Sequence, residues 1–216
     1  MLTELDWLLY PEDCEVLITP HSLSPYLIEK NGSTALRWYS EQNNWKIAKN
    51  HQIYDLENID VFIRPPKVRY LSGLYTWLQW LKRDHNLDLA TAEWFAKEFS
   101  FLNRHYLPQF HWLLNLARYV NPTCTINFHK FETFSQHFPN NHNPHGFKYE
   151  ADWGRNVLQQ QKKLDFWFYL DDILRELDGK SFNWYEFRNY FKSNYSDTYH
   201  VLTRTSSSIS NVLSTT

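Results

Sequence analysis

The stretch IDVFIRPPKVRYLSGLYTWLQWL, residues 59–81, contains the change of hydrophobic period that decides the fold. Its first part, Ile59–Arg64, is rich in β-branched and aromatic residues, which is typical of a strand. The two prolines that follow end the strand, because proline cannot donate to a strand ladder. From Tyr70 to Leu81 the apolar residues recur every three or four positions, which predicts an amphipathic helix. A strand is therefore followed directly by a helix.

The residues before this change of period predict further strands. Cys14–Thr19 is a short apolar segment closed by a proline. Ala35–Tyr39 and Trp45–Ala48 alternate apolar and polar residues on either side of a turn-like segment, so residues 34–49 are expected to form a β-hairpin. Strands this close in sequence favour an antiparallel sheet, because parallel neighbours need a long crossover connection.

Mainly helices are expected after Pro66. The expected elements are helices following Asp88 and Pro108, a strand at Thr123–Phe131, a long helix at Arg155–Leu177 and a last helix at Trp184–Lys192. The last helix has a clear start signal, because Asn183 and Glu186 have the spacing of a capping box.

The sequence therefore predicts an α+β fold, with an antiparallel β-sheet in the N-terminal part packed against a mainly helical C-terminal part. We expect a single domain over residues 1–202, β-rich at 1–66 and mainly helical at 67–202. A Ser/Thr-rich tail follows at residues 203–216. A chain of 216 residues is long enough to bury a sizeable core.

Composition excludes several classes of protein. The five glycines are too dispersed for a P-loop or a dinucleotide-binding turn. The two cysteines, Cys14 and Cys124, are too few for a disulfide framework or a four-cysteine zinc site. No apolar run approaches the length of a membrane span, and the N-terminus lacks the basic start of a signal peptide. We expect a soluble cytoplasmic protein without a membrane partner, a small-molecule substrate or a cofactor.

No residue pattern indicates an active site. Histidines gather between His129 and His145, and Cys124 lies nearby, but only His142 and His145 have the spacing of a metal-ligand pair. Neighbouring Asp171 and Asp172 diverge by about 100° on a helix, which favours a solvated surface over a shared metal site. We therefore predict no bound metal, no catalytic residues and a chain that is not an enzyme.

Charge is divided unevenly along the chain. Residues 1–60 carry a net charge of −6, residues 61–163 carry +6, and residues 164–216 carry −2. A basic middle between acidic ends suits a subunit that turns one face toward nucleic acid and others toward protein. The overall charge of −2 argues against tight nucleic-acid binding by the chain alone, since phosphate neutralisation supplies most of that affinity.

Two segments combine cations with aromatic rings. The connector RPPKVRY, residues 64–70, predicts phosphate contacts from Arg64, Lys67, Arg69 and Tyr70. The expected hairpin adds Arg37 and Lys46 beside Trp38, Tyr39 and Trp45. These aromatic residues either pack the sheet against the helices or form a platform on which bases stack; the sequence leaves both open.

The hairpin segment also carries a resemblance to a known family. Ala35-Leu-Arg-Trp-Tyr-Ser, a polar turn and Trp45-Lys-Ile-Ala resemble an early segment of a small accessory subunit of type III-D CRISPR effector complexes. About 20 residues carry the resemblance. It implies a non-catalytic subunit of a ribonucleoprotein, with the large effector subunits as partners and guide or target RNA as a further contact. It supplies no catalytic residues.

Three functional hypotheses follow, in order of preference. The first is the structural, RNA-contacting CRISPR subunit, which predicts co-purification with effector subunits and RNA. The second is a protein-only adaptor or inhibitor that docks one partner through its aromatic surface and is indifferent to nuclease. The third is a metal-dependent hydrolase that uses the His129–His145 stretch and contains stoichiometric metal.

Overall fold

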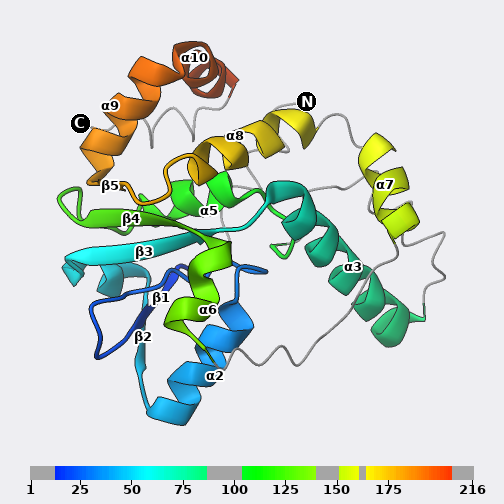
Figure 1. Ribbon diagram of the computed structural model, residues 1–216, viewed down its shortest axis with the longest axis horizontal. Coiled ribbons are helices and arrows are strands. Elements are labelled where there is room, and N and C mark those ends of the chain that lie inside the picture. Colours follow the sequence, from blue (N-terminus) through cyan, green and yellow to red (C-terminus); the bar gives the residue numbers. More distant parts are fainter. Residues whose placement is uncertain (1–12, 87–103, 140–150, 161–163, 206–216) are drawn as a thin grey trace.

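The computed structural model describes residues 13–86, 104–139, 151–160 and 164–205 (Figure 1). In chain order the elements are β1 (Glu15–Ile18), α2 (Ser33–Asn43), β2 (Lys46–Lys49), the 3-10 helix η1 (Asn50–Asp55), β3 (Asn58–Ile63), α3 (Pro66–His85), α5 (Gln109–Leu116), β4 (Thr125–Lys130), η2 (Phe131–Thr133), α6 (Phe134–His137), α7 (Ala151–Gln160), α8 (Asp165–Arg175), β5 (Ser181–Phe182), α9 (Trp184–Asn194) and α10 (Ser196–Thr205). An antiparallel pair of strands near the N-terminus and a mainly helical C-terminal part confirm the predicted α+β class.

The strands form two connected sheets. Strands β1 and β2 pair antiparallel, while β3, β4 and β5 form a second sheet in that order. Strand β3 runs parallel to β4, and β5 runs antiparallel to β4. Isolated bridges join Tyr26 to Val16 and Pro25 to Asp60, so the segment between β1 and α2 links the two sheets.

The parallel pair corrects the predicted topology. We expected β3 to join an antiparallel sheet of N-terminal strands, whereas its partner β4 lies more than sixty residues later in the chain. The helices α3 and α5 lie between the two strands in sequence and provide the long crossover that a parallel pair needs. The sequence therefore predicted β1, β2, β3 and β4 as strands, but it assigned β3 to the wrong kind of sheet.

The predicted hairpin at residues 34–49 is wrong in its first half. Residues 33–43 form helix α2, and only the second half is a strand, β2. Ala35, Leu36 and Ser40 are buried on one side of this helix, a spacing that fits a helical turn better than strand alternation. The turn-like segment is the end of α2, closed by Asn44 in a left-handed conformation with φ 53°.

Other boundaries also differ from those predicted. The expected single helix at Arg155–Leu177 is described as two helices, α7 and α8. Helix α10 extends to Thr205, so the predicted tail begins inside a helix; residues 206–216 lie outside the described part. The helix expected after Asp88 also falls outside it. The capping box of α9 is confirmed, because Asn183 accepts from the Glu186 amide and the Glu186 carboxylate accepts from the Asn183 amide.

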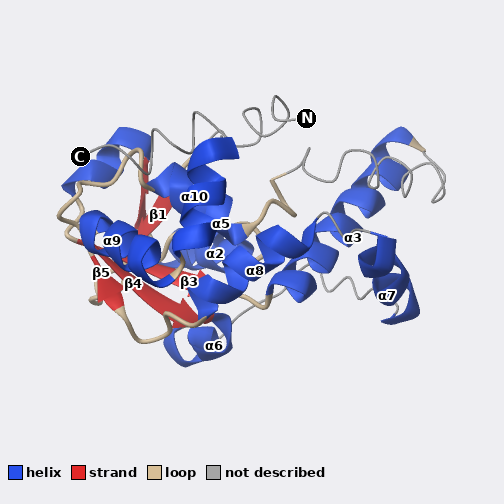
Figure 2. Ribbon diagram, turned by 90° about the horizontal axis from the view of Figure 1, so that it is seen from above, coloured by secondary structure: helices blue, strands red, loops and turns tan. Residues whose placement is uncertain are grey.

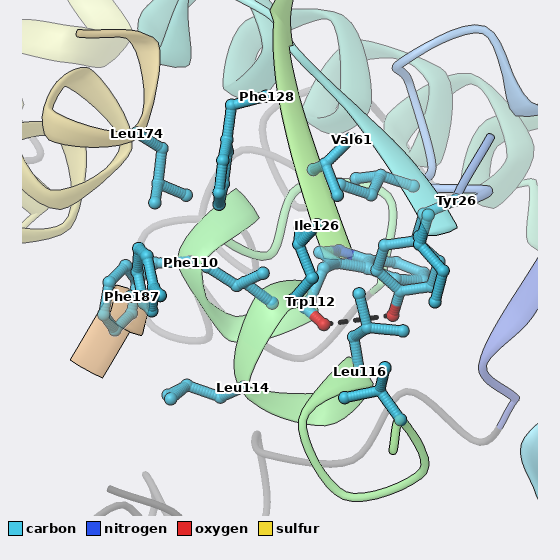
Figure 3. Packing of buried hydrophobic residues seen from close by; sticks show 14 of the residues in the cluster. Tyr26, Val61, Phe110, Trp112, Leu114, Leu116, Ile126, Phe128, Leu174 and Phe187 are labelled. Carbon is cyan, nitrogen blue, oxygen red and sulfur yellow. Dashed lines mark hydrogen bonds between the residues drawn. The ribbon is translucent and has the colours of Figure 1, made fainter. Parts of the chain in front are cut away.

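The main core covers one face of the β3–β4 sheet. Alternate residues of the two strands, including Val61, Ile126 and Phe128, contact apolar side chains of α5, α8 and α9 (Figure 3). The hydroxyl of Tyr26 reaches into this core and donates to the Trp112 carbonyl at 3.0 Å. Helices α2 and α6 supply a second cluster that contains Phe62, on the opposite face of the sheet. The sheet is therefore covered on both faces (Figure 2).

A third cluster holds α3 against α8 and α7. Tyr70, Leu74 and Phe168 belong to it, and Trp153 of α7 packs at its edge. Helix α3 projects away from the sheet with α7 beside it (Figures 1 and 2). Gly73 allows the chain before α5 to touch α3, because a Cβ atom there would overlap the backbone carbonyl of His105.

One histidine lies entirely inside the helical layer. His111 of α5 is fully buried against Trp167, with ring centroids 4.2 Å apart, and neither ring nitrogen has a hydrogen-bond partner among the described residues. Burial, assisted by the positive charge of Arg69, lowers the pKa of His111 to about 3. The imidazole is therefore neutral in the folded protein at physiological pH.

The close approach at Gly73 gives a stability prediction. We expect Gly73→Ala to destabilise the fold by about 3 kcal/mol, because two backbone segments would have to separate. Gly179→Ala is the control: its site has φ 74° but open space, so only the left-handed backbone costs about 1 kcal/mol. Urea unfolding of both variants measures the difference. A smaller loss at position 73 than at 179 would contradict the contact.

Burial of His111 predicts an acid-sensitive component of stability. Its pKa in the fold lies below its unfolded value of about 6.5. The stabilising contribution is therefore present above pH 6.5 and is lost as pH falls toward 3, by at most about 1.4 kcal/mol per pH unit. We expect His111→Leu to show a shallower loss of unfolding free energy between pH 6.5 and 4 than the wild type. His51→Leu, at an exposed site, should leave the wild-type slope unchanged.

Candidate functional site

Two of the six predicted RNA-contacting residues lie inside the protein. Arg69 is 1% exposed and Tyr70 is 2% exposed, because both face inward from the first turns of α3. Arg69 donates through Nε to the Glu29 carbonyl and through Nη1 to the Leu107 carbonyl. Tyr70 belongs to the cluster between α3 and α8. Their prediction as RNA contacts is therefore wrong, since a nucleic acid cannot reach either side chain.

A third predicted residue, Arg37, is bound by carboxylates. Its Nη2 lies 2.7 Å from Glu15, and its Nη1 lies 3.2 Å from Glu29. Lys49 also pairs with Glu15, at 2.7 Å. Burial acts to raise the pKa of Glu15, but hydrogen bonds from Lys49 and Arg37 outweigh it and hold that pKa below its usual value. Two cations and two carboxylates thus compensate one another, which leaves Arg37 little charge to offer a phosphate.

The remaining three predicted residues are accessible but lie on different elements. Lys46 is exposed at the start of β2, and Lys67 is exposed at the start of α3. Arg64 is half-buried just after β3, where its guanidinium lies 5.4 Å over the ring of Phe131. The six residues therefore do not form one continuous surface, and only Arg64 and Lys67 keep an accessible place on the predicted connector.

The end of β3 is fixed by a buried amide. The Gln109 side chain accepts from the Arg64 amide at 2.8 Å and donates to the Arg64 carbonyl at 2.9 Å. The same side chain accepts from Asn31 and donates to Asp171. All four hydrogen-bonding positions of the carboxamide are thus used, and Arg64 is held rigidly at the sheet edge.

Asp171 corrects a second prediction. We expected Asp171 and Asp172 to be solvated helix surface, but Asp171 is 2% exposed and accepts from the backbone amides of Gln109 and Phe110. It therefore caps the N-terminus of α5 from a different helix, α8. Burial raises the pKa of Asp171 to about 6, although these hydrogen bonds and the charge of Arg69 oppose the shift. Asp172 is exposed, as expected.

His129 is paired with a buried aspartate on the sheet face below α6. Its Nε2 donates to Asp60 at 2.9 Å, while its ring stacks on Phe62 and lies 6.1 Å from the His137 ring. Asp60 also accepts from the Ser24 amide and from Asn127. Because these bonds join β3, β4 and the linking segment, the geometry fits a structural anchor of the sheet.

The third hypothesis, a metal-dependent hydrolase, gains no support from the described residues. Within residues 13–86, 104–139, 151–160 and 164–205, no three His, Cys, Asp or Glu side chains are grouped so that they could hold a metal ion. His142 and His145 lie outside these ranges. Both cysteines are buried, and burial raises the pKa of Cys14 to about 12 and that of Cys124 to about 11.

A surface that the sequence did not predict runs along α9. Tyr185, Arg188 and Lys192 are spaced by three and four residues and therefore share one side of this helix. The Arg188 guanidinium lies 5.8 Å over the Tyr185 ring, and the Lys192 ammonium lies 5.9 Å over the ring of Tyr199 in α10. We call these four residues the α9 stripe. The helical spacing of its tyrosine and cations was the signal that could have identified it.

The composition of the α9 stripe allows two kinds of contact. Tyr185 is 36% exposed and Lys192 is exposed, while Arg188 and Tyr199 are half-buried. The four residues include no acid. Cations can neutralise phosphates, and tyrosine rings can stack on bases.

Neither the described helices nor the comparisons with known proteins assign the chain to a class. No helix among the described residues is both long enough and apolar enough to cross a membrane. No family model matches the chain, and neither a curated protein nor a solved structure matches it.

Proposed function

We propose that the chain is a non-catalytic subunit of a CRISPR ribonucleoprotein effector complex, in which it contacts RNA and neighbouring protein subunits. The kind of complex comes from the resemblance of residues 35–48 to type III-D accessory subunits. The observation that carries the RNA-contacting role is the α9 stripe, in which two tyrosines and two cations lie together on an accessible surface.

The stripe has the chemistry of a single-stranded RNA contact. Proteins that hold single strands combine cations along the backbone with aromatic rings on which bases stack. Arg188 and Lys192 supply the first component, and Tyr185 and Tyr199 supply the second. Each cation already lies over a tyrosine ring, which orders the side chains before RNA arrives and lowers the entropic cost of binding.

The accessible residues of the connector support the same role. Lys67 is exposed at the start of α3, and Arg64 is held beside it by the Gln109 amide bonds. A net charge of −2 for the whole chain favours RNA contact within an assembly rather than by an isolated protein. Partner subunits would then supply much of the binding energy.

The α9 stripe gives a direct test on RNA affinity. We expect Tyr185→Ala to weaken binding of a fluorescent single-stranded RNA by roughly 5- to 150-fold, which corresponds to about 1–3 kcal/mol for one stacked base. Tyr54→Ala removes a tyrosine that is 54% exposed on a different element and should leave affinity unchanged. Fluorescence anisotropy at low salt measures both. Equal affinities of the two variants would contradict base stacking on the stripe.

The cations of the stripe are tested by salt dependence. We expect Lys192→Gln to reduce the slope of log affinity against log salt by about 0.7, the effect of one phosphate contact in a single strand. Lys82→Gln, an exposed lysine in the last turn of α3, is the control and should keep the wild-type slope.

A pull-down with and without RNase separates the proposed complex from the adaptor hypothesis. Recovery of CRISPR effector subunits together with guide RNA from the native host is the expected result. Recovery of one unrelated protein partner, unchanged by RNase, would overturn the ribonucleoprotein proposal and favour the protein-only adaptor.

A further inference from the structure

We propose that His129 and His137 bind a divalent transition-metal ion on the β3–β4 sheet, with Asp60 as the hydrogen-bond partner that orients His129. The ion belongs to the class that imidazole nitrogens prefer, such as Zn²⁺, Ni²⁺ or Cu²⁺. The site binds the ion and carries out no reaction. It lies on the sheet face opposite the main core and does not depend on the α9 stripe.

Strand alternation places His129 on this face. Its neighbour Phe128 belongs to the main core, so the His129 side chain lies on the other side of the sheet. In the parallel register His129 stands beside Phe62 of β3, and the two rings stack with centroids 4.9 Å apart. The His129 side chain is 24% exposed, so part of the imidazole reaches solvent.

The short helix α6 brings His137 to the same place. Phe134 begins α6 and Phe138 follows it, and both pack against Phe62 with ring centroids 5.3 and 6.4 Å away. His137 ends α6 and lies against the same ring at 5.8 Å. Two imidazoles from different elements therefore share one phenyl ring as a neighbour, and their own centroids are 6.1 Å apart.

Asp60 selects the tautomer of His129 that a metal requires. His129 Nε2 lies 2.9 Å from the carboxylate, and because a carboxylate only accepts, Nε2 carries the proton and Nδ1 keeps its lone pair. Among the described residues, neither His129 Nδ1 nor the His137 ring has a hydrogen-bond partner. A carboxylate on the second nitrogen is the usual outer partner of a metal-binding histidine, because it orients the ring and raises its basicity.

Asp60 is a buried carboxylate that lacks a strong cation. It is 1% exposed and accepts from the Ser24 amide at 2.6 Å and from Asn127 at 3.3 Å, which are neutral donors. Among the described residues, no lysine or arginine pairs with it. Burying a carboxylate is costly unless a positive charge compensates it. A metal ion on His129 Nδ1 would supply that charge through the imidazole.

The separation of the two rings suits a shared ion. Since a zinc–nitrogen bond measures about 2.0–2.1 Å, two imidazoles on one ion have ring centres at most about 6.5 Å apart. The 6.1 Å between His129 and His137 lies within this limit. Tetrahedral geometry brings the centres to about 5.3 Å, and His137 is exposed, so its side chain can turn to meet this distance.

The site has two protein ligands, and water completes the coordination. Within the described residues, no third His, Cys, Asp or Glu side chain joins the two histidines. We therefore expect weaker binding than in a structural zinc site, which has four protein ligands. The sequence predicted no bound metal, because His129 and His137 lack the short spacing of a ligand pair and meet only through the fold.

Titration calorimetry of the untagged intact chain with Zn²⁺ tests the two ligands. We expect His137→Ala to weaken Zn²⁺ binding by at least about tenfold, because one imidazole remains. His51→Ala removes an exposed histidine on η1 and should bind as the wild type does. Circular dichroism verifies that each variant is folded, and the exposure of His137 favours folding of its variant.

The role of Asp60 needs a readout other than stability. In ¹⁵N NMR of the histidine rings, Zn²⁺ should shift the resonance of His129 Nδ1 and leave Nε2 protonated. Asp60→Asn keeps both ligands and should weaken Zn²⁺ binding by roughly 10- to 100-fold, as removal of an outer partner does. A Zn²⁺ shift confined to Nε2 of His129 would contradict the assigned tautomer.

The double variant His142→Ala with His145→Ala separates this site from the neighbouring histidines, which lie outside the described residues. We expect Zn²⁺ binding to persist in it. The proposal would be overturned if Zn²⁺ binding disappeared in the double variant, persisted undiminished in folded His137→Ala, or were absent from the wild type at submillimolar Zn²⁺.

Discussion

The carboxamide of Gln109 is the interaction on which the rest of the structure depends. It joins both backbone groups of Arg64 at the end of β3 to Asn31 and to Asp171 of α8. Asp171 in turn caps α5. One buried polar group thus sets the positions of a strand end, two helices and the loop before α2. Removing it would leave several buried donors and acceptors without partners, each costing about 1–3 kcal/mol.

The hydrogen bonds of Gln109 matter because β3 and β4 run parallel. A parallel pair needs a crossover that leaves the end of one strand and returns to the start of the next. Helix α3 begins just after β3, and the chain returns to β4 through α5. Gln109 is the first residue of α5, and its side chain bonds to Arg64 just before α3, so it lies where both helices begin. The contact at Gly73 keeps the returning segment against α3. The close backbone contact at Gly73 and the hydrogen bonds of Gln109 therefore both hold the crossover in place.

Local patterns predicted the elements whose signals are contained in a few neighbouring residues. The strand and helix on either side of Pro65-Pro66 and the capping box at Asn183 were correct, because prolines and caps act through the backbone nearby. Helix α2 was missed because an aromatic segment of five residues satisfies both a strand and a helical pattern. Its burial against Leu17 and Phe134 decides between them, and that contact is not visible in the local sequence.

The candidate site was harder to predict for the same reason. Arg69 and Asp171 were assigned to the surface because charged residues are seldom fully buried without partners. Backbone groups from distant segments bind both side chains in the interior: the Glu29 and Leu107 carbonyls accept from Arg69, and the α5 amides donate to Asp171.

The fold treats Arg37 differently from the pair Arg64 and Arg69. Arg37 lies among carboxylates and is compensated, so its cluster stabilises the contact between α2 and β1 and offers little to a ligand. Arg64 and Arg69 are held largely by carbonyl oxygens, which satisfy hydrogen bonds without cancelling charge. The printed hydrogen bonds of Arg64 and Arg69 therefore go to the backbone, whereas those of Arg37 go to carboxylates. Each of these guanidinium groups joins a residue next to or in α3 to the segment before α2, so the two arginines hold distant parts of the chain together through the backbone.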